Sequence, residues 1–434
     1  MSTRLFCLLL PWLTLWSCGA AGRRAQAQTD TTSHVQLEFK LGSGLKATAV
    51  EIHSLDSGPA LLSKTLDAPN GKVEVDEALT RSVTGPMVVF IQADDGSLWT
   101  ARLEDGEYVG TESRRFSIEP VKYEENTPFS EMRAEYIRQH RMPVASGEYS
   151  GITRVQDDVY AVVHDKGSGG GIFLFNIPID QSGIVGDIRA KEVPGNAGKE
   201  EGRDNEDIVY VPSSNTLFVS AEEDQSIREY TIEGEPTGVE LAVPEDLKAI
   251  QSNAGFEALA YDSARGYFWA ATESSLQEEG LHKNIIRLQR FSGTQPDQRY
   301  LYMMNQPIVP QDQASGASAY VYGLSAMTAL EDGRLIMLER EVYVPGGSII
   351  EKALGAFTLS TLYLVDPLND NSGILRKETI TRVITSALNL ANYEGMCLGP
   401  KLSGGRQSIL LVADSQNGQG GLTGEYLQIL AVKP

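Results

Sequence analysis

The chain has 434 residues, of which 41% are hydrophobic, so it is long enough for more than one domain and apolar enough to build buried cores. Its 37 basic and 58 acidic residues give a formal net charge of −21, which would repel nucleic acid and anionic membranes over most of the surface. We therefore expect no nucleic-acid partner and regard cations as more natural companions. An acidic surface also serves simply to keep a secreted protein soluble.

The first residues predict an export signal. Arg4 precedes an apolar run over residues 5–16, which is too short to span a membrane and has the length of a signal-peptide core. Two processing sites remain open, because LWSC ending at Cys18 resembles a bacterial lipobox and AQA at residues 25–27 suits ordinary cleavage. We expect a signal over residues 1–27, no membrane span, and an exported protein that is periplasmic, extracellular or lipid-anchored to the outer membrane at Cys18.

Cysteine usage agrees with export. Of three cysteines, Cys7 and Cys18 lie in the signal region, so ordinary cleavage would leave Cys397 alone and exclude an internal disulfide. Cys397 lies within the apolar run GMCLG, where a buried small hydrophobic residue is the simpler interpretation and a nucleophile is the alternative.

Residues 34–115 predict a small β-sandwich domain. Runs such as VQLEFKL, KVEVDEAL and PMVVFIQA alternate apolar and polar residues, and Gly, Asp, Asn and Pro separate them. This is the pattern of short antiparallel strands with one buried face.

Residues 116–146 predict a linker that contains a helix. Thr127 suits an N-cap, Pro128 suits the first helical position, and Pro143 would stop the helix after residue 141.

From Gly147 onward, one hairpin pattern occurs five times. In each copy an apolar strand starts at a residue that we term the lead position, turns, and returns as a second apolar strand that ends at the return position. The first strands are YSGIT, NEDIVY, FEALAY, LSAMTA and YEGMCL, and the second are VYAVVHD, LFVSAEE, YFWAATE, LIMLER and ILLVADS. The lead positions are Ser150, Glu206, Glu257, Ser325 and Glu394, and the return positions are His164, Glu222, Glu273, Glu339 and Asp414.

Residues 147–434 therefore predict a β-propeller within an all-β protein. Further strands such as GIFLFNI and TLYLVD follow the hairpins, and units of three or four antiparallel strands gain a core by stacking radially. Five blades are visible, and a sixth over residues 349–390 is an open alternative, so the propeller is five- or six-bladed. Because the chain ends one strand after the last hairpin, we expect its outer strand to come from before Gly147, as in FSIEPVKY.

The propeller geometry turns the repeated acids into a candidate metal site. The two strands of each hairpin start and end at one mouth of the channel, so the acids would meet there and raise one another's pKa unless a cation lay among them. Ca²⁺, a hard ion with oxygen ligands, would relieve the repulsion. Alternatively, these acids bind backbone N–H groups or Arg side chains at the strand ends. The candidate metal ligands are Glu206, Glu222, Glu257, Glu273, Glu339, Glu394 and Asp414.

Basic residues stand beside these acids in the sequence, among them Arg203, Arg287 and Arg340. An Arg fork suits phosphate or carboxylate oxygens, so Arg203 and Arg340 are candidates for substrate binding, although each could instead neutralise a neighbouring Glu. His164 alone among the five histidines occupies a return position. Either His164 or Glu257 is the expected catalytic base.

The same hairpins resemble a known family. SGI, FEALAY with YFWAATES, GLSAMTALEDGRLIMLER, and YEGMCLGP with ILLVADSQNG and LQIL, in this order, look like the phytase-like family, described by an esterase-like activity of phytase. The resemblance covers residues 147–432 and implies a secreted propeller with a phosphoester or ester hydrolase role. By analogy with calcium-dependent propeller phytases, it implies that channel acids hold Ca²⁺ and a water. Ser150 and Ser325 depart from the acidic pattern and thin the expected ring.

Other chemistries fit the sequence poorly. GLSAM at residues 323–327 lacks the last Gly of a nucleophile elbow and leads into a strand, which argues against Ser325 as a nucleophile. We therefore predict a monomeric, metal-assisted hydrolase that acts on a small phosphoester or other ester at the channel mouth. The alternative is a non-catalytic surface or periplasmic binding module for a glycan, peptide or partner protein, because propellers serve both purposes.

Overall fold

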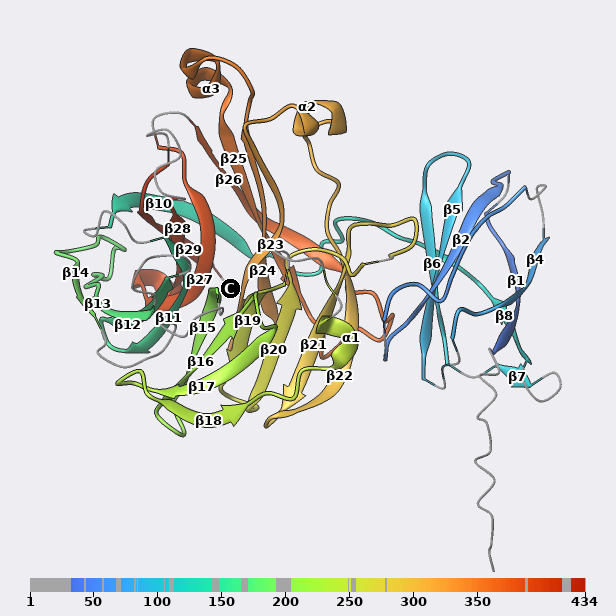
Figure 1. Cartoon of the computed structure of the whole chain (residues 1–434), viewed down its shortest axis with the longest axis horizontal. Helices are drawn as coiled ribbons and strands as arrows, with labels where there is room; N and C mark the ends of the chain where they lie inside the picture. The colour runs from blue at the N-terminus through green and yellow to red at the C-terminus, as the bar shows by residue number, and fades with distance from the viewer. Residues whose placement is uncertain are drawn as a thin grey trace, which may run out of the picture.

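The structure, a computed structural model, describes residues 33–433 except 43, 57, 68–71, 82, 84, 105, 109–112, 143–147, 165–170, 193–203, 249, 251–254, 278, 387–388 and 416–422. The expected export signal and the candidate substrate ligand Arg203 lie outside the described residues. Within the described part of the chain, no helix is long and apolar enough to cross a membrane. Two bodies built of β-strands lie side by side along the longest axis of the molecule (Figure 1).

The first body is a β-sandwich of two sheets, with strand orders β4-β1-β8-β7 and β3-β2-β5-β6-β9. Alternate side chains face its interior, as in β1, where Val35, Leu37 and Phe39 share one buried core with Val50 and Ile91. The predicted sandwich is therefore confirmed, and its last strand ends at residue 122. Its strands are β1 (His34–Lys40), β2 (Ala47–Ser54), β3 (Leu62–Thr65), β4 (Lys72–Ala78), β5 (Met87–Ala93), β6 (Leu98–Leu103), β7 (Glu107–Tyr108), β8 (Ser113–Ile118) and β9 (Val121–Lys122).

The second body is a propeller of five four-stranded antiparallel sheets among the described residues. Blade 1 holds β11 (Tyr149–Gln156), β12 (Val159–His164), β13 (Gly171–Asn176) and β14 (Arg189–Glu192). Blade 2 holds β15 (Asn205–Val211), β16 (Thr216–Ala221), β17 (Ser226–Thr231) and β18 (Pro236–Glu240). Blade 3 holds β19 (Phe256–Asp262), β20 (Tyr267–Thr272), β21 (Ile285–Ser292) and β22 (Gln295–Met303). Blade 4 holds β23 (Ala319–Ala329), β24 (Leu335–Val344), β25 (Phe357–Val365) and β26 (Lys377–Ser386).

Blade 5 combines both ends of the propeller segment. Its strands are β27 (Asn392–Lys401), β28 (Gln407–Asp414), β29 (Tyr426–Lys433) and, from before blade 1, β10 (Arg133–Arg141), which pairs with β29. The short helices α1 (Glu245–Lys248), α2 (Gln311–Ser315), α3 (Ile349–Gly355) and η1 (Ser403–Gly405) lie in connections. Figure 1 shows α2 and α3 beyond the end of blade 4.

The blades form a closed ring around the channel. The innermost strands β11, β15, β19, β23 and β27 each contact the next, and β27 contacts β11. Apolar side chains fill the space between adjacent blades, as where Trp269 and Tyr302 of blade 3 pack in one buried cluster with Met337 and Tyr363 of blade 4. Each blade thus buries both faces only by stacking on its neighbours, which explains why the strand pattern repeats.

The outer strand of blade 5 comes from before Gly147, as the sequence predicted, but the segment that supplies it differs from the predicted one and was expected to be a helix. Residues 133–141 form β10, where the sequence predicted a helix over residues 127–141. The physical reason is tertiary, because the edge of β29 offers unpaired backbone groups that an extended segment satisfies, and this pairing overrides local helix signals. The predicted donor of the outer strand, FSIEPVKY, instead contributes β8 and β9 to the sandwich.

The sixth blade considered for residues 349–390 is not a separate sheet. Among the described residues of this stretch, β25 and β26 complete blade 4, and α3 precedes them. The propeller of the described residues therefore has five blades.

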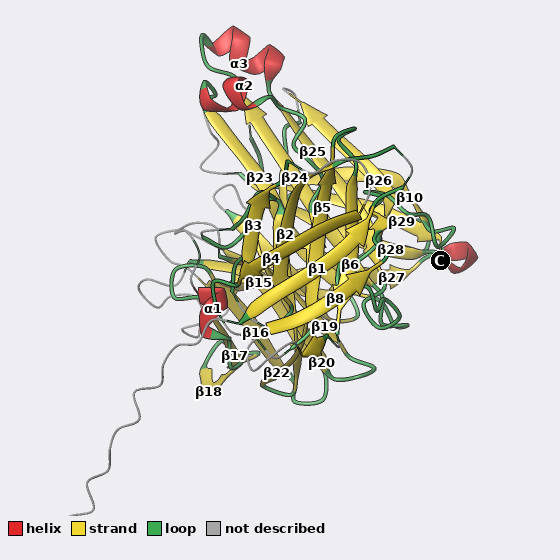
Figure 2. Cartoon of the chain, turned by 90° about the vertical axis from the view of Figure 1, so that its right-hand side faces the viewer, coloured by secondary structure: helices red, strands yellow, loops and turns green. Residues whose placement is uncertain are grey.

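The sandwich docks against blade 3 through a buried polar contact. Arg287 forms an ion pair with Glu279, and its Nη2 donates to the Gly58 carbonyl oxygen at 2.8 Å. His53 lies 2.6 Å from a Glu51 oxygen, and the side chains of Glu51, His53, Glu279 and Arg287 are all buried. An apolar cluster across the same interface includes Phe90 and Leu301. Figure 2 shows the sandwich lying over this side of the propeller.

Candidate functional site

A β-bulge occurs at the lead position of all five first strands. A bulge places one extra residue on a strand and re-aims its side chain. Each lead residue lies within its bulge. The bulges therefore set the direction of the lead side chains, all of which lie at the same mouth of the channel. The ladder shifts register between Tyr149 and Gly151, Asn205 and Ile208, Phe256 and Ala258, Leu324 and Ala326, and Tyr393 and Gly395.

The ladders also show which residues of the second strands are equivalent. The residue before each lead position pairs with His164, Ala221, Thr272, Glu339 and Ala413 in blades 1 to 5. The equivalent mouth residue follows each of these, which gives Glu222, Glu273, Arg340 and Asp414 in blades 2 to 5. The sequence-based alignment was therefore one residue short in blades 1 and 4. Such a shift matters because successive side chains of a strand point to opposite faces.

Carboxylates of blades 2 and 3 lie together at this mouth in two groups that share Glu222. Within each group, the oxygens that could bind a metal lie within 4.8 Å of one another. The predicted convergence of Glu206, Glu222, Glu257 and Glu273 is therefore present in the structure. The two groups are Asp204, Glu206 and Glu222, and Glu222, Glu257 and Glu273; with Glu394 we term them the acidic mouth.

Arg340 lies among these acids and joins blade 4 to its two neighbours. Its Nη2 is 2.8 Å from a Glu273 oxygen and 3.9 Å from a Glu257 oxygen, and its Nη1 donates to Glu394. Glu394 also accepts a hydrogen bond of 2.7 Å from the Asn392 amide. The guanidinium is buried between carboxylates of blades 3 and 5. Its contacts therefore indicate a role in positioning these acids and argue against a role in binding substrate.

Burial and mutual repulsion shift the protonation of this mouth. Burial is the main cause that raises the pKa of Glu257 well above its usual value, Glu273 adds to it, and Arg340 opposes it. Burial lowers the pKa of Arg340, but Glu394, Glu257 and Glu273 outweigh burial and the net shift is upward. Glu257 therefore holds a proton more readily than a free Glu, and a nearby cation would favour its ionised form.

Glu339 does not join the acidic mouth. Its oxygens lie 2.6 Å from Lys377 Nζ and 2.6 Å from the Tyr302 hydroxyl, and it accepts the Asn305 N–H at 3.1 Å. These contacts lie between blades 3 and 4, on the face of β24 opposite to Arg340. We therefore remove Glu339 from the candidate metal ligands, because Arg340 occupies the mouth position of blade 4.

Asp414 occupies the mouth position of blade 5. It is buried and pairs with Asn392 in the ladder between β27 and β28. Among the described residues, it does not belong to the groups whose oxygens could share one ion.

His164 ends β12 and is buried. Its ring stacks on Phe173 with 5.8 Å between centroids, and burial lowers its pKa, which favours the neutral imidazole.

The two serine lead positions contact blade 5. Ser150 Oγ is 3.5 Å from a Glu394 oxygen, and Ser325 Oγ donates to the Tyr393 carbonyl at 3.1 Å. Ser325 therefore links two blades, in keeping with the sequence argument against a nucleophile.

Sequence reasoning missed three polar residues of the mouth. Asp204 precedes Glu206 by two residues and Asn392 precedes Glu394 by two, so the period of a strand could have identified both. Gln225 gave no such signal, because it lies in the turn after Glu222 with a positive φ of 53°.

Gln225 bears on whether the mouth suits a cation. Its Nε2 donates to the Glu222 carbonyl, and its Oε1 is buried without a hydrogen-bond partner among the described residues. The adjacent Gly255 donates its N–H to a Glu222 carboxylate oxygen at 2.7 Å, and a Cβ at Gly255 would lie 2.7 Å from Gln225 Oε1. A buried unsatisfied oxygen beside carboxylates fits a hard cation that takes oxygen ligands.

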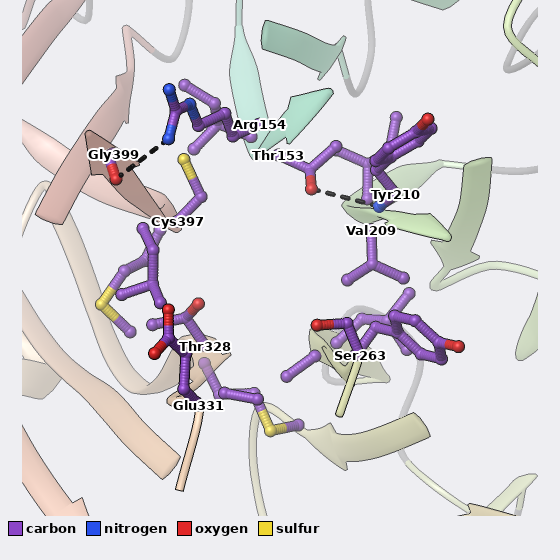
Figure 3. Close-up of a pocket in the computed structure, with 18 of the residues that line it drawn as sticks. Thr153, Arg154, Val209, Tyr210, Ser263, Thr328, Glu331, Cys397 and Gly399 are labelled. Atoms are coloured by element: carbon purple, nitrogen blue, oxygen red, sulfur yellow. Dashed lines mark hydrogen bonds between the residues drawn. The ribbon is translucent and has the colours of Figure 1, made fainter. Parts of the chain in front are cut away.

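The opposite mouth of the channel has a different chemistry. There the five first strands line a cavity of about 290 Å³, which we term the far cavity. Because these strands run from the acidic mouth toward this cavity, the two lie at opposite ends of the channel. Figure 3 shows Arg154, Val209, Ser263, Thr328 and Cys397 around the opening.

The chain belongs to the Phytase-like family, described as having esterase-like activity of phytase. The match to this family covers residues 144–416, which is more than half of the chain and includes all five hairpins. The resemblance noted from the sequence is therefore confirmed. A comparison with curated protein sequences found no match.

Several solved structures are similar to this chain at low identity. They include a periplasmic gluconolactonase of Pseudomonas aeruginosa (13% identity, 88% of this chain and 96% of that chain, TM-score 0.31) and the catalytic domain of a GH62 α-L-arabinofuranosidase of Coprinopsis cinerea (9%, 67%, 92%, 0.38). A member of the duf4221 family from Bacteroides vulgatus is also similar (9%, 70%, 98%, 0.36). Likenesses at this level do not bear on the activity of this chain.

Proposed function

We propose that the protein is a metal-assisted hydrolase that cleaves a phosphoester, or another ester, at the acidic mouth. The observation that carries this proposal is that two clusters of three carboxylates share Glu222, beside the unsatisfied amide oxygen of Gln225. Such a set of oxygens suits a hard divalent cation. Membership of the Phytase-like family supports a hydrolase of this kind.

The proposed ion is Ca²⁺, held by oxygens of Glu206, Glu222, Glu257 and Glu273. When bound, such an ion polarises an ester oxygen and lowers the pKa of a water. The side chains themselves keep the ligands in place, because Arg340 fixes Glu273 and the Gly255 N–H orients Glu222. Glu394 and Asp414 are proposed to complete the site from blade 5.

Glu257 is the proposed base that takes the proton of the attacking water. A general base works best when its pKa lies near the operating pH, and burial with Glu273 raises the pKa of Glu257 in that direction. His164 is the second candidate, since burial keeps its imidazole neutral and able to accept a proton. Its place in the ladder is equivalent to that of Glu339 in blade 4, one residue before the mouth position, so Glu257 is the first candidate.

Arg203 is the proposed contact to the anionic group of the substrate. Arg340 was a candidate for the same role, but its bonds to Glu273 and Glu394 would have to break first. We therefore propose that Arg340 holds the acids in position and does not contact the substrate directly. Export, a lipid anchor at Cys18 and a monomeric state are proposed on the sequence features described above.

The direct test is hydrolysis of p-nitrophenyl phosphate, phytate and p-nitrophenyl acetate with Ca²⁺ and with EGTA. We expect turnover only with Ca²⁺. Glu257→Gln should lower kcat by about 100-fold or more, because a general base contributes about 10²–10⁴-fold. Glu235→Gln changes an exposed acid of blade 2 outside the mouth and should leave the rate unchanged.

Absence of turnover on all three substrates in both buffers would contradict the hydrolase. If Ca²⁺ nevertheless raised the melting temperature of the same preparation, the mouth would bind the ion without catalysis. That result would support the alternative of a binding module for a glycan, peptide or partner protein.

A further inference from the structure

The far cavity has the size and position of a ligand site that the proposed hydrolase does not use. Its volume of about 290 Å³ lies near the lower end of the range for small-molecule pockets. All five blades line it, and it opens at the end of the channel away from the acidic mouth. A ligand there would therefore be recognised by residues independent of the proposed metal ligands.

The charge of the far cavity differs from that of the protein as a whole. Arg154 lines it and donates to the carbonyl oxygens of Asp157 at 2.8 Å and Gly399 at 3.4 Å. Within the described part of the chain, no carboxylate lies at ion-pair distance from this guanidinium. Lys401 and Glu331 also line the cavity, where they pair with each other at 3.2 Å on exposed side chains. The cavity therefore carries one uncompensated positive charge in a chain of net charge −21.

The walls of the far cavity combine apolar groups with small hydroxyl side chains. Val209, Cys397 and Met327 supply buried apolar surface, whereas Ser263 and Thr328 supply hydroxyl groups. Figure 3 shows Val209, Cys397, Ser263 and Thr328 around one opening, with Arg154 at its edge and its guanidinium directed to Gly399. Such a lining suits a compact body of a few carbon atoms, while the Arg suits the oxygens of an anionic group.

We propose that the far cavity binds a small molecule bearing an oxyanion, either a carboxylate or a phosphate group, with Arg154 as its charged contact. The anion is held at the end of the channel where the acidic mouth repels it least. Two of the five donor N–H groups of Arg154 are engaged with carbonyl oxygens in the structure, which leaves others for a ligand. This site is separate from the proposed hydrolase and stands or falls independently of it.

The test is calorimetric titration of the intact protein with inorganic phosphate and with succinate, at low ionic strength and with EGTA present. The chelator removes divalent cations, so the acidic mouth offers no site for an anion. We expect at least one of the two probes to bind. Arg154→Gln should weaken binding by about tenfold or more, because a charge-assisted bidentate contact is lost. Val209→Phe should abolish it by filling the cavity while leaving the charge in place.

Two controls locate the binding. Arg189→Gln removes an exposed Arg of the same blade that pairs with Asp187, and it should bind as the unaltered protein does. Glu222→Gln changes the acidic mouth and should also leave binding unchanged. Melting curves of each variant establish that it folds.

The outcomes separate the two ligand sources. Binding of phosphate alone indicates a phosphorylated ligand, binding of succinate alone indicates a carboxylate, and binding of both indicates a general oxyanion site. If neither probe binds, or if a probe binds equally well to Arg154→Gln and Val209→Phe, the proposal is wrong.

Discussion

At the residue scale, one extra residue in each first strand decides where the acids of the mouth point. Glu206, Glu257 and Glu394 fall within bulges, and a bulge re-aims a side chain without any change of residue type. In β24 the alternation of the strand separates Glu339 from Arg340, which are adjacent in the sequence. Glu339 faces Lys377, and Arg340 faces Glu273 and Glu394. One step along the chain thus exchanges an acid for a base at the mouth.

Arg340 is expected to be a main source of stability at the mouth. Arg340→Met would leave buried Glu273 and Glu394 without their cation, and breaking a buried ion pair lowers the free energy of unfolding by about 3–5 kcal/mol. In the background Glu394→Gln the same change should cost less, because one of the charges is already gone. The two changes should therefore be coupled by about 1–3 kcal/mol in urea unfolding without Ca²⁺. Effects that add within about 0.5 kcal/mol would show that the contact does not exist.

His164 is expected to make the protein sensitive to mild acid. Burial lowers its pKa in the folded state, whereas the unfolded chain takes up the proton near the ordinary pKa of about 6.5. As the pH falls through that value, the unfolded state gains a proton that the folded state does not, so stability decreases. This contribution of His164 to stability is fully present above its pKa in the unfolded chain. It is lost as the pH falls toward the lower pKa of His164 in the folded protein.

The measurement is urea unfolding of the unaltered protein and of His164→Phe, which keeps an aromatic ring against Phe173. The variant should lose less stability than the unaltered protein between pH 7.5 and pH 5.5. The same loss in both proteins would mean that His164 titrates normally.

At the element scale, the ring depends on a strand borrowed from outside the repeat. β10 pairs with β29 over residues 133–141, and Arg133 anchors its start by an ion pair of 2.6 Å with Glu378 of blade 4. The N–H groups of Phe129 and Ser130 also donate to Glu378. Local signals could not predict this strand, because its partner is almost 300 residues away in the sequence and only pairing decides its conformation.

The hairpins of the blades, in contrast, could be predicted from the sequence. Runs such as FEALAY and YFWAAT are mostly apolar, and turns rich in Gly, Asp and Asn separate such runs, so strand pairs were visible locally. Their repetition predicted the propeller and the shared mouth. The bulges were not visible, because no residue type marks them, and the alignment of the return positions therefore slipped in blades 1 and 4.

At the scale of the whole molecule, the sandwich and the propeller are joined by a buried polar contact. Arg287 was considered with the acids of the mouth, but the structure places it against Glu279, Gly58 and His53 at the domain interface. The strand pattern of each domain carries no information about the partner domain, so a contact of this kind cannot be predicted from local sequence. Because breaking this buried ion pair would be costly, we expect the two domains to unfold together.

Arg287→Met is expected to uncouple the domains. The variant would leave buried Glu279 without its cation, at a cost of about 3–5 kcal/mol. Scanning calorimetry should then show two separate transitions in place of one. Arg265→Met, which removes a partly exposed pair with Asp262 in blade 3, should retain a single transition. A single unchanged transition in Arg287→Met would contradict the proposed coupling.

The central claim is that carboxylates of separate blades converge on one cation at the acidic mouth, and titration of Ca²⁺ into the metal-free protein tests it most directly. Glu222 belongs to both carboxylate clusters, so Glu222→Gln should weaken binding by about tenfold or more, because the number of charged ligands tunes the affinity of a Ca²⁺ site. Glu235→Gln should bind as tightly as the unaltered protein. Absence of calcium binding to the unaltered protein, or equal affinity in all three proteins, would contradict the account.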